Sequence, residues 1–162
     1  MNIEWEERDG IIFFQLVSLR KTGKEWLSYF EKHHIPASRH AREMLLSPDF
    51  AATVSKAGYV YQVRIMKGNS VPDRKRTTRL IGQRAHWLIP DVLTPSAEVS
   101  PLIRAAFSDT EIKAMGFEEI VTFHFPINGR FLDIDTETGK LESAPAGPND
   151  TWHKEHGFAF IQ

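Results

Sequence analysis

One segment of this chain concentrates the residue types that bind anions. Residues 64–84, called here the basic segment, hold seven basic side chains and one acid, a net charge of +6 in a chain of net charge −1. Guanidinium groups suit phosphate and carboxylate because their planar fork donates two hydrogen bonds at once. We therefore predict an anion- or partner-binding surface made by Arg64, Lys67, Arg74, Lys75, Arg76, Arg79 and Arg84.

Aromatic side chains close to the basic segment suggest a partner for it. Tyr59, Tyr61 and Trp87 are near in sequence, and aromatic faces can stack on nucleic-acid bases. A helix starting at Arg74 would also place Lys75, Arg79, Gln83 and His86 on one stripe. These features indicate nucleic acid or an acidic protein surface as the partner.

A plainer interpretation of the basic segment stays open. Its charges can form a solvated helix face that the protein's own acids partly neutralise. Residues 118–155 supply eight acids against three bases, so an internal partner is available. The two interpretations differ in whether the cations are paired within the fold.

An enzyme is the alternative function. His124 lies inside the apolar run 121–126 and, together with Arg64, Arg74 and Arg79, could act on a phosphate- or carboxylate-bearing substrate. A structural histidine with both ring nitrogens hydrogen-bonded explains His124 as well. The sequence contains no Gly-x-Ser-x-Gly motif and no glycine-rich phosphate loop. Our leading hypothesis is a non-enzymatic binding domain without a cofactor.

Two groups of candidate metal ligands deserve weighing. His153 and His156 have i, i+3 spacing, to which Asp150 or Glu155 could add an oxygen ligand, but they stand between a loop and a terminal strand, where helical spacing is not assured. The alternation of Asp133, Asp135 and Glu137 lacks the glycine of a calcium loop, so we expect a strand whose acidic face meets water. We predict no metal site.

Length and composition indicate one domain. A chain of 162 residues with 41% hydrophobic and 25% charged residues is typical of a single globular domain. There are no cysteines, and the first residues are acidic, unlike a signal peptide. The longest apolar run, residues 11–19, is shorter than the roughly 20 residues that span a bilayer. We expect a cytoplasmic protein that does not enter membranes.

The elements that must position these residues follow from apolar spacing and from turn residues. Capping boxes at Thr22 and Ser108 predict helix starts, Pro48 should close a helix, and Asn128-Gly129 predicts a hairpin. The sequence predicts an α+β fold with a mainly antiparallel sheet, helices in the first two-thirds and a C-terminal meander. The expected strands are 11–19, 58–67, 119–125, 130–135, one from 141 and 157–161, and the expected helices are 23–34, 36–46, 74–88, 96–107 (or from Ser100) and 109–115.

Overall fold

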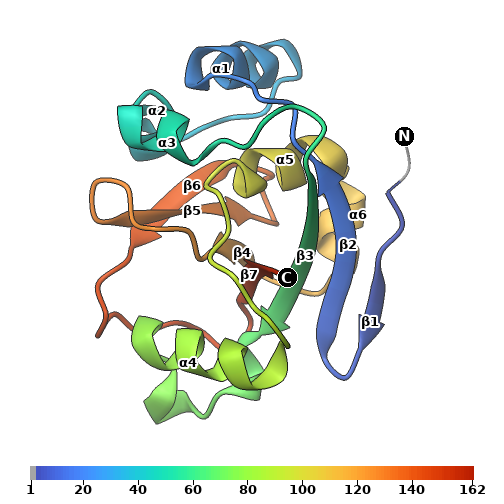
Figure 1. Ribbon diagram of the computed structural model, residues 1–162, viewed down its shortest axis with the longest axis vertical. Helices are drawn as coiled ribbons and strands as arrows, with labels where there is room; N and C mark the ends of the chain where they lie inside the picture. The colour runs from blue at the N-terminus through green and yellow to red at the C-terminus, as the bar shows by residue number, and fades with distance from the viewer. Residues whose placement is uncertain (1–2) are drawn as a thin grey trace.

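Seven strands form one sheet in the computed structural model, which describes residues 3–162 (Figure 1). The spatial order is β1-β2-β3-β7-β4-β5-β6, and all neighbours pair antiparallel except β4 and β7, which are parallel. The predicted α+β class with a mainly antiparallel sheet is confirmed. The strands are β1 (Glu6–Arg8), β2 (Ile11–Val17), β3 (Val60–Lys67), β4 (Glu119–Thr122), β5 (Arg130–Asp135), β6 (Leu141–Pro145) and β7 (Gly157–Ile161).

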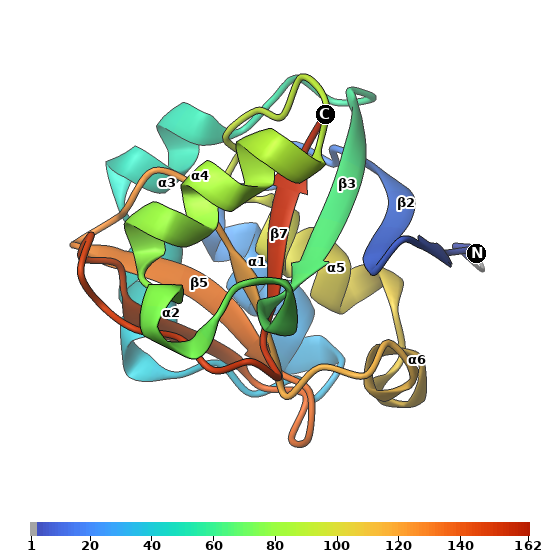
Figure 2. The ribbon, with the colours of Figure 1, turned by 90° about the horizontal axis from the view of Figure 1, so that it is seen from below.

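Helices cover both faces of the sheet. The helix α4 lies across one face, as Figure 2 shows, and the other five α-helices of residues 3–162 pack on the opposite face. No helix in this part of the chain is long and apolar enough to cross a membrane. The helices are α1 (Gly23–Lys32), α2 (Arg39–Leu45), α3 (Pro48–Thr53), α4 (Thr78–Leu88), α5 (Val99–Ala106) and α6 (Asp109–Ala114), with 3₁₀ turns η1 (Gly68–Ser70) and η2 (Asp73–Lys75).

The sheet therefore separates two apolar cores. Trp26, Phe30 and Phe50 belong to the larger core, beneath the five helices. The smaller core lies under α4, where Ile81 and Ala85 pack with side chains from β4, β7 and the loop before β7. Alternation along the strands supplies both cores, because successive side chains point to opposite faces of a sheet.

Both capping boxes form as predicted. The Thr22 hydroxyl accepts the Glu25 N–H at 3.1 Å, and the Glu25 carboxylate accepts the Thr22 N–H at 3.2 Å. Ser108 and Glu111 make the same reciprocal pair at 3.2 and 2.7 Å. Each box satisfies N–H groups that the first turn of a helix leaves without intrahelical partners.

The hairpin at Asn128-Gly129 is confirmed. Both residues have positive φ, 53° and 72°, and Ile127 and Arg130 exchange two N–H···O bonds of 3.0 Å. Positive φ at both central residues defines the type I′ turn that this dipeptide favours. The turn leads directly into β5.

Several predicted boundaries are wrong. The helix predicted to start at Arg74 starts instead at Thr78, because the Thr77 side chain caps it there by accepting the Leu80 N–H. Residues 73–75 form the 3₁₀ turn η2. Pro48 opens α3 instead of closing a helix, since proline is tolerated in a first turn. The strand predicted to reach Phe125 ends at Thr122.

The sequence prediction also missed β1. Asp9 and Gly10, with φ of 52° and 76°, turn the chain between β1 and β2, so Asp-Gly was an available hairpin marker.

Candidate functional site

The basic segment connects β3 to α4 and is tied to a distant part of the chain. The N–H groups of Thr78 and Arg79 donate to the carbonyls of Asp150 and Pro148 at 3.0 and 3.1 Å. The indole N–H of Trp152 donates to the Thr78 hydroxyl at 2.9 Å. These bonds hold the start of α4 against residues 148–152, so the surface rests on a fixed backbone.

Arg76 is an internal anchor and not part of the surface. It is only 7% exposed, pairs with Asp73, and donates to the carbonyls of Val71 at 3.0 Å and Trp152 at 3.3 Å. The guanidinium therefore links the loop after β3 to the segment that precedes β7. The assignment of Arg76 to the ligand-binding set is therefore wrong, because its guanidinium is buried and already bonded to Asp73 and to two backbone carbonyls.

Arg64 and Lys67 are engaged elsewhere. The Arg64 guanidinium lies 4.5 Å above the Phe13 ring, and its Nε donates to Gln162 at 2.9 Å. Partial burial, with Arg8 nearby, lowers the pKa of Arg64 below its usual range. The Lys67 ammonium pairs with Glu7 at 3.0 Å. These two cations stabilise the β1–β3 side of the sheet.

The four remaining cations are exposed. Within residues 3–162, no ion pair involves Arg74, Lys75, Arg79 or Arg84. In the described part of the chain, the acids of region 118–155 pair with Lys140 and His156, through Glu142 and Glu119, and with no cation of the basic segment. Direct ion pairing of these four cations with the C-terminal acids does not occur within residues 3–162. A solvated helix face, the plainer interpretation of the basic segment, stays open.

An open hollow of about 520 Å³ lies between the loop and α4. Trp87 forms part of its lining and is 84% exposed, beside Lys75 from the loop and Arg84 from the helix. The predicted helical stripe starting at Lys75 is wrong because Lys75 precedes the helix. The stripe that lines the hollow is instead Leu80, Gln83, Arg84 and Trp87, and the loop contributes Ser70, Val71, Pro72 and Lys75.

Of the predicted stacking residues, only Trp87 reaches this hollow. Tyr61 is 2% exposed and its hydroxyl donates to the buried Glu98 carboxylate. Burial, reinforced by that bond, raises the pKa of Tyr61 to about 12. Tyr59 is exposed but precedes β3, whose other end at Lys67 lies roughly 26 Å away at about 3.3 Å per residue. The two tyrosines are near the basic segment in sequence but do not reach the hollow. Tyr61 is buried, and the extended strand β3 separates Tyr59 from the loop that follows Lys67.

His124 is structural, and the enzyme alternative built on it is not supported. Its Nδ1 donates to the Phe125 carbonyl at 2.7 Å, and its Nε2 accepts the Leu132 N–H at 2.9 Å. Burial lowers the pKa of His124 to about 4. With both nitrogens bonded to backbone, no lone pair remains for a substrate.

A larger hollow, of about 850 Å³, lies at the β1–β2 edge and was not foreseen. Its walls are mainly apolar and come from the N-terminal segment, β2 and α5. Arg8, Phe13 and Arg64 are among its lining residues, and the two guanidinium groups lie 4.4 and 4.5 Å from the centre of the Phe13 ring. Because Glu4 and Glu6 also line this hollow and Glu6 pairs with Arg8, it offers a weaker anion site than the hollow on α4.

Carboxyl groups gather on the α4 face of β4 and β5. Glu119 lies opposite Asp135 in the register, and Asp133 lies opposite Val121. Asp133 is 2% exposed, which corrects the expectation of an acidic face in water. Burial, with Glu119, Glu142 and Asp135 adding repulsion, raises the pKa of Asp133 to about 8. Burial and Asp135 likewise raise the pKa of Glu119.

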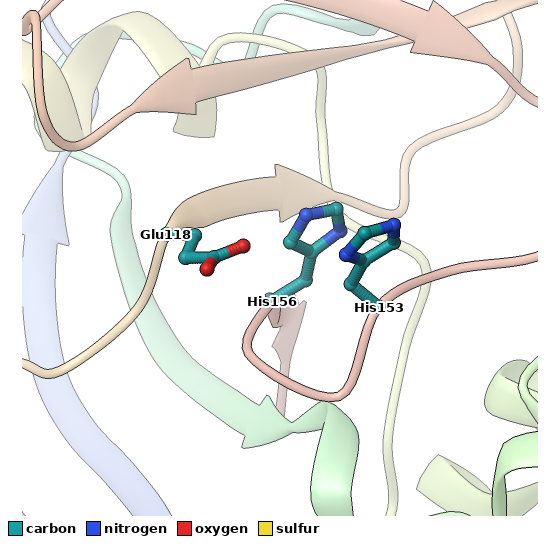
Figure 3. A group of neighbouring side chains, drawn as sticks. All are labelled: Glu118, His153 and His156. Atoms are coloured by element: carbon teal, nitrogen blue, oxygen red, sulfur yellow. The ribbon is translucent and has the colours of Figure 1, made fainter.

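His153 and His156 lie close together beside this cluster of carboxyl groups, with His156 3.8 Å from the Glu119 carboxylate. Their rings stack at 5.2 Å with planes 13° apart, and Figure 3 shows the Glu118 carboxylate beside them. The carboxylate that lies with the two histidines is that of Glu118, and not that of Asp150 or Glu155, the two oxygen donors that the sequence offered. Glu118 was missed because it is 35 residues from His153 and only the β4–β7 pairing brings them close.

Comparisons of this chain with protein-family models, with curated proteins and with solved structures give no match.

Proposed function

We propose that this protein binds single-stranded nucleic acid through a surface formed by Arg74, Lys75, Arg79, Arg84 and Trp87, called here the α4 surface. The observation that carries the proposal is the position of Trp87. Its indole is 84% exposed in a hollow that also contains Lys75 and Arg84. An exposed aromatic face between cations is the combination that holds an unpaired base and its phosphates.

The charge state of the α4 surface supports this proposal. Its four cations have no carboxylate partners among residues 3–162, so phosphate contacts would not have to displace internal ion pairs. Phosphate neutralisation releases counterions and supplies most of the affinity for a polyanion. The cations would therefore provide affinity, and Trp87 the preference for unpaired bases.

Binding without catalysis agrees better with the hollow than an enzyme does. The residues that line it include no carboxylate and no histidine, the groups that most often transfer protons. An acidic protein is the alternative partner, but the exposed indole favours a ligand with flat bases. We place this activity in the cytoplasm, where a chain without cysteine meets nucleic acid under reducing conditions.

The experiment is a titration of a labelled single-stranded oligonucleotide, followed by fluorescence anisotropy at low salt. Trp87→Ala should weaken binding by about 1–3 kcal/mol, the range for losing one stacked base. Tyr59→Ala is the matched control, because Tyr59 is an exposed aromatic near the far end of β3. It should leave affinity unchanged.

The cations are tested in the same assay. The double change Lys75→Ala and Arg84→Ala should weaken binding, whereas Lys32→Ala and Arg42→Ala, exposed on α1 and α2, should not. Equal losses in both pairs would show non-specific attraction and contradict the proposal. Binding of duplex as tightly as single strand would contradict the role of Trp87.

A further inference from the structure

We propose that Glu118, His153 and His156 form a site for a divalent transition-metal ion, with Zn²⁺ the class that suits the ligands. Each residue offers one ligand atom, and the three atoms lie within 4.8 Å of one another. Figure 3 shows the carboxylate on one side of the imidazole pair. This site shares no residue with the α4 surface and does not depend on the function proposed for it.

The spacing is close to that of a bound ion. Zinc ligands lie about 2.0–2.2 Å from the metal in a tetrahedron, so that neighbouring ligand atoms are roughly 3.4 Å apart. Glu118 and His153 are exposed and free to change rotamer, while His156 is mostly buried. The stacked rings, 13° from parallel, require His153 to rotate so that both lone pairs point at one ion.

The backbone under the site is already fixed. The Glu118 N–H donates to the Glu155 carbonyl at 3.0 Å, and the His156 N–H donates to the His153 carbonyl at 3.2 Å. Gly68 donates to the His156 carbonyl at 2.8 Å, and a Cβ at Gly68 would lie 2.5 Å from the His153 oxygen. Glycine at position 68 therefore allows the start of η1 to pack against the histidine turn at close range.

His156 also has the surroundings of a metal ligand. Its Nδ1 is buried and has no hydrogen-bond partner within residues 3–162. Its Nε2 faces the Glu119 carboxylate at 3.8 Å. Ligating histidines commonly turn one nitrogen to the metal and the other to a carboxylate, which fixes the tautomer. A metal at Nδ1 would give this buried atom the partner it lacks.

The ligand set selects the ion and predicts an open position. Two imidazoles favour zinc-like cations over Mg²⁺ and Ca²⁺, which take oxygen ligands almost exclusively. Glu119 and Asp135 add negative charge on the neighbouring strands. Three protein ligands leave a fourth position for water or for an anionic donor from a ligand, as in catalytic zinc sites.

The test is calorimetric titration of Zn²⁺ into the tag-free full chain. The wild type should bind one ion per chain. His153→Ala and Glu118→Gln should each weaken binding at least tenfold. Both residues are exposed, so neither change threatens the core. His33→Ala is the matched control, an exposed histidine on the opposite side of the sheet, and should bind zinc like the wild type.

Two further measurements guard the result. Circular dichroism should show that His153→Ala keeps its fold, and excess Mg²⁺ should not displace the ion. Failure of the wild type to bind zinc would overturn the proposal. So would equal affinity in His153→Ala and the wild type, or a loss in His33→Ala as large as in His153→Ala.

Discussion

Burial keeps the Asp133 carboxyl protonated, and therefore neutral, at neutral pH. Its Oδ1 is buried without a hydrogen-bond partner in residues 3–162, and burial raises the pKa of the carboxyl to about 8. The folded protein therefore holds this proton at neutral pH, while the unfolded chain releases it near 3.8, the ordinary value. Between these values the folded state binds more protons, so this group makes stability fall as pH rises.

We predict that Asp133→Asn removes this loss. The amide mimics the neutral carboxyl and cannot ionise, so the variant should gain stability relative to wild type as pH rises from about 5 to 8. The gain at pH 8 should exceed about 1 kcal/mol, since each pKa unit is worth about 1.4 kcal/mol. Urea unfolding at both pH values measures the difference. A difference between the two proteins that is independent of pH would show that Asp133 ionises normally in the fold.

At the scale of elements, β7 holds the sheet together. It lies between β3 and β4 and forms ladders with both, although it is the last strand of the chain. Phe158 is fully buried in the smaller core, where its ring packs on Phe123 and Trp152 at 5.3 and 5.8 Å. A strand with partners on both sides and both faces covered is expected to unfold only with the whole domain.

We predict that Phe158→Ala costs about 3–5 kcal/mol of unfolding free energy, the usual result of truncating a buried phenylalanine. Phe125→Ala is the control, because Phe125 is 71% exposed and its loss should change stability by no more than about 0.5 kcal/mol. Chemical denaturation measures both. Similar costs for the two variants would show that β7 does not lie at the centre of the sheet.

Most elements could be predicted from local sequence, but their arrangement could not. The capping boxes and the Asn128-Gly129 turn depend on neighbouring residues, and all three form. The insertion of β7 between β3 and β4 depends on contacts about 40 to 100 residues apart in the chain, which no local pattern encodes. Pro48 shows a local ambiguity, because the same proline that ends one helix can begin the next.

At the scale of the whole molecule, the basic segment could be located from the sequence, but which of its cations are structural and which are exposed could not. Seven cations lie between residues 64 and 84, and four of them are exposed and make no ion pair with any residue of 3–162. Arg76 donates to backbone carbonyls, and Lys67 pairs with Glu7. Arg64 packs on the Phe13 ring and donates to Gln162. These partners come from other strands and loops, so the sequence alone could not separate structural cations from available ones.

The whole-molecule consequence is a fold with separated charges. The carboxyl groups of β4 and β5 lie on the same sheet face as α4 but make no ion pair with its exposed cations in the described residues. The α4 surface should therefore carry a positive potential that draws in polyanions and weakens with salt.

Salt dependence of oligonucleotide binding tests the central claim most directly. If Arg74, Lys75, Arg79 and Arg84 each neutralise one phosphate of a single strand, log affinity should fall with log salt at a slope of about −2.8, that is about −0.7 per phosphate. From about 50 to 200 mM salt the affinity should drop roughly fiftyfold. Changing all four residues to Ala should remove most of the slope and leave stability within about 0.5 kcal/mol of wild type. A wild type that binds no single strand at about 50 mM salt, or a quadruple variant with an unchanged slope, would contradict the proposed role of the α4 surface.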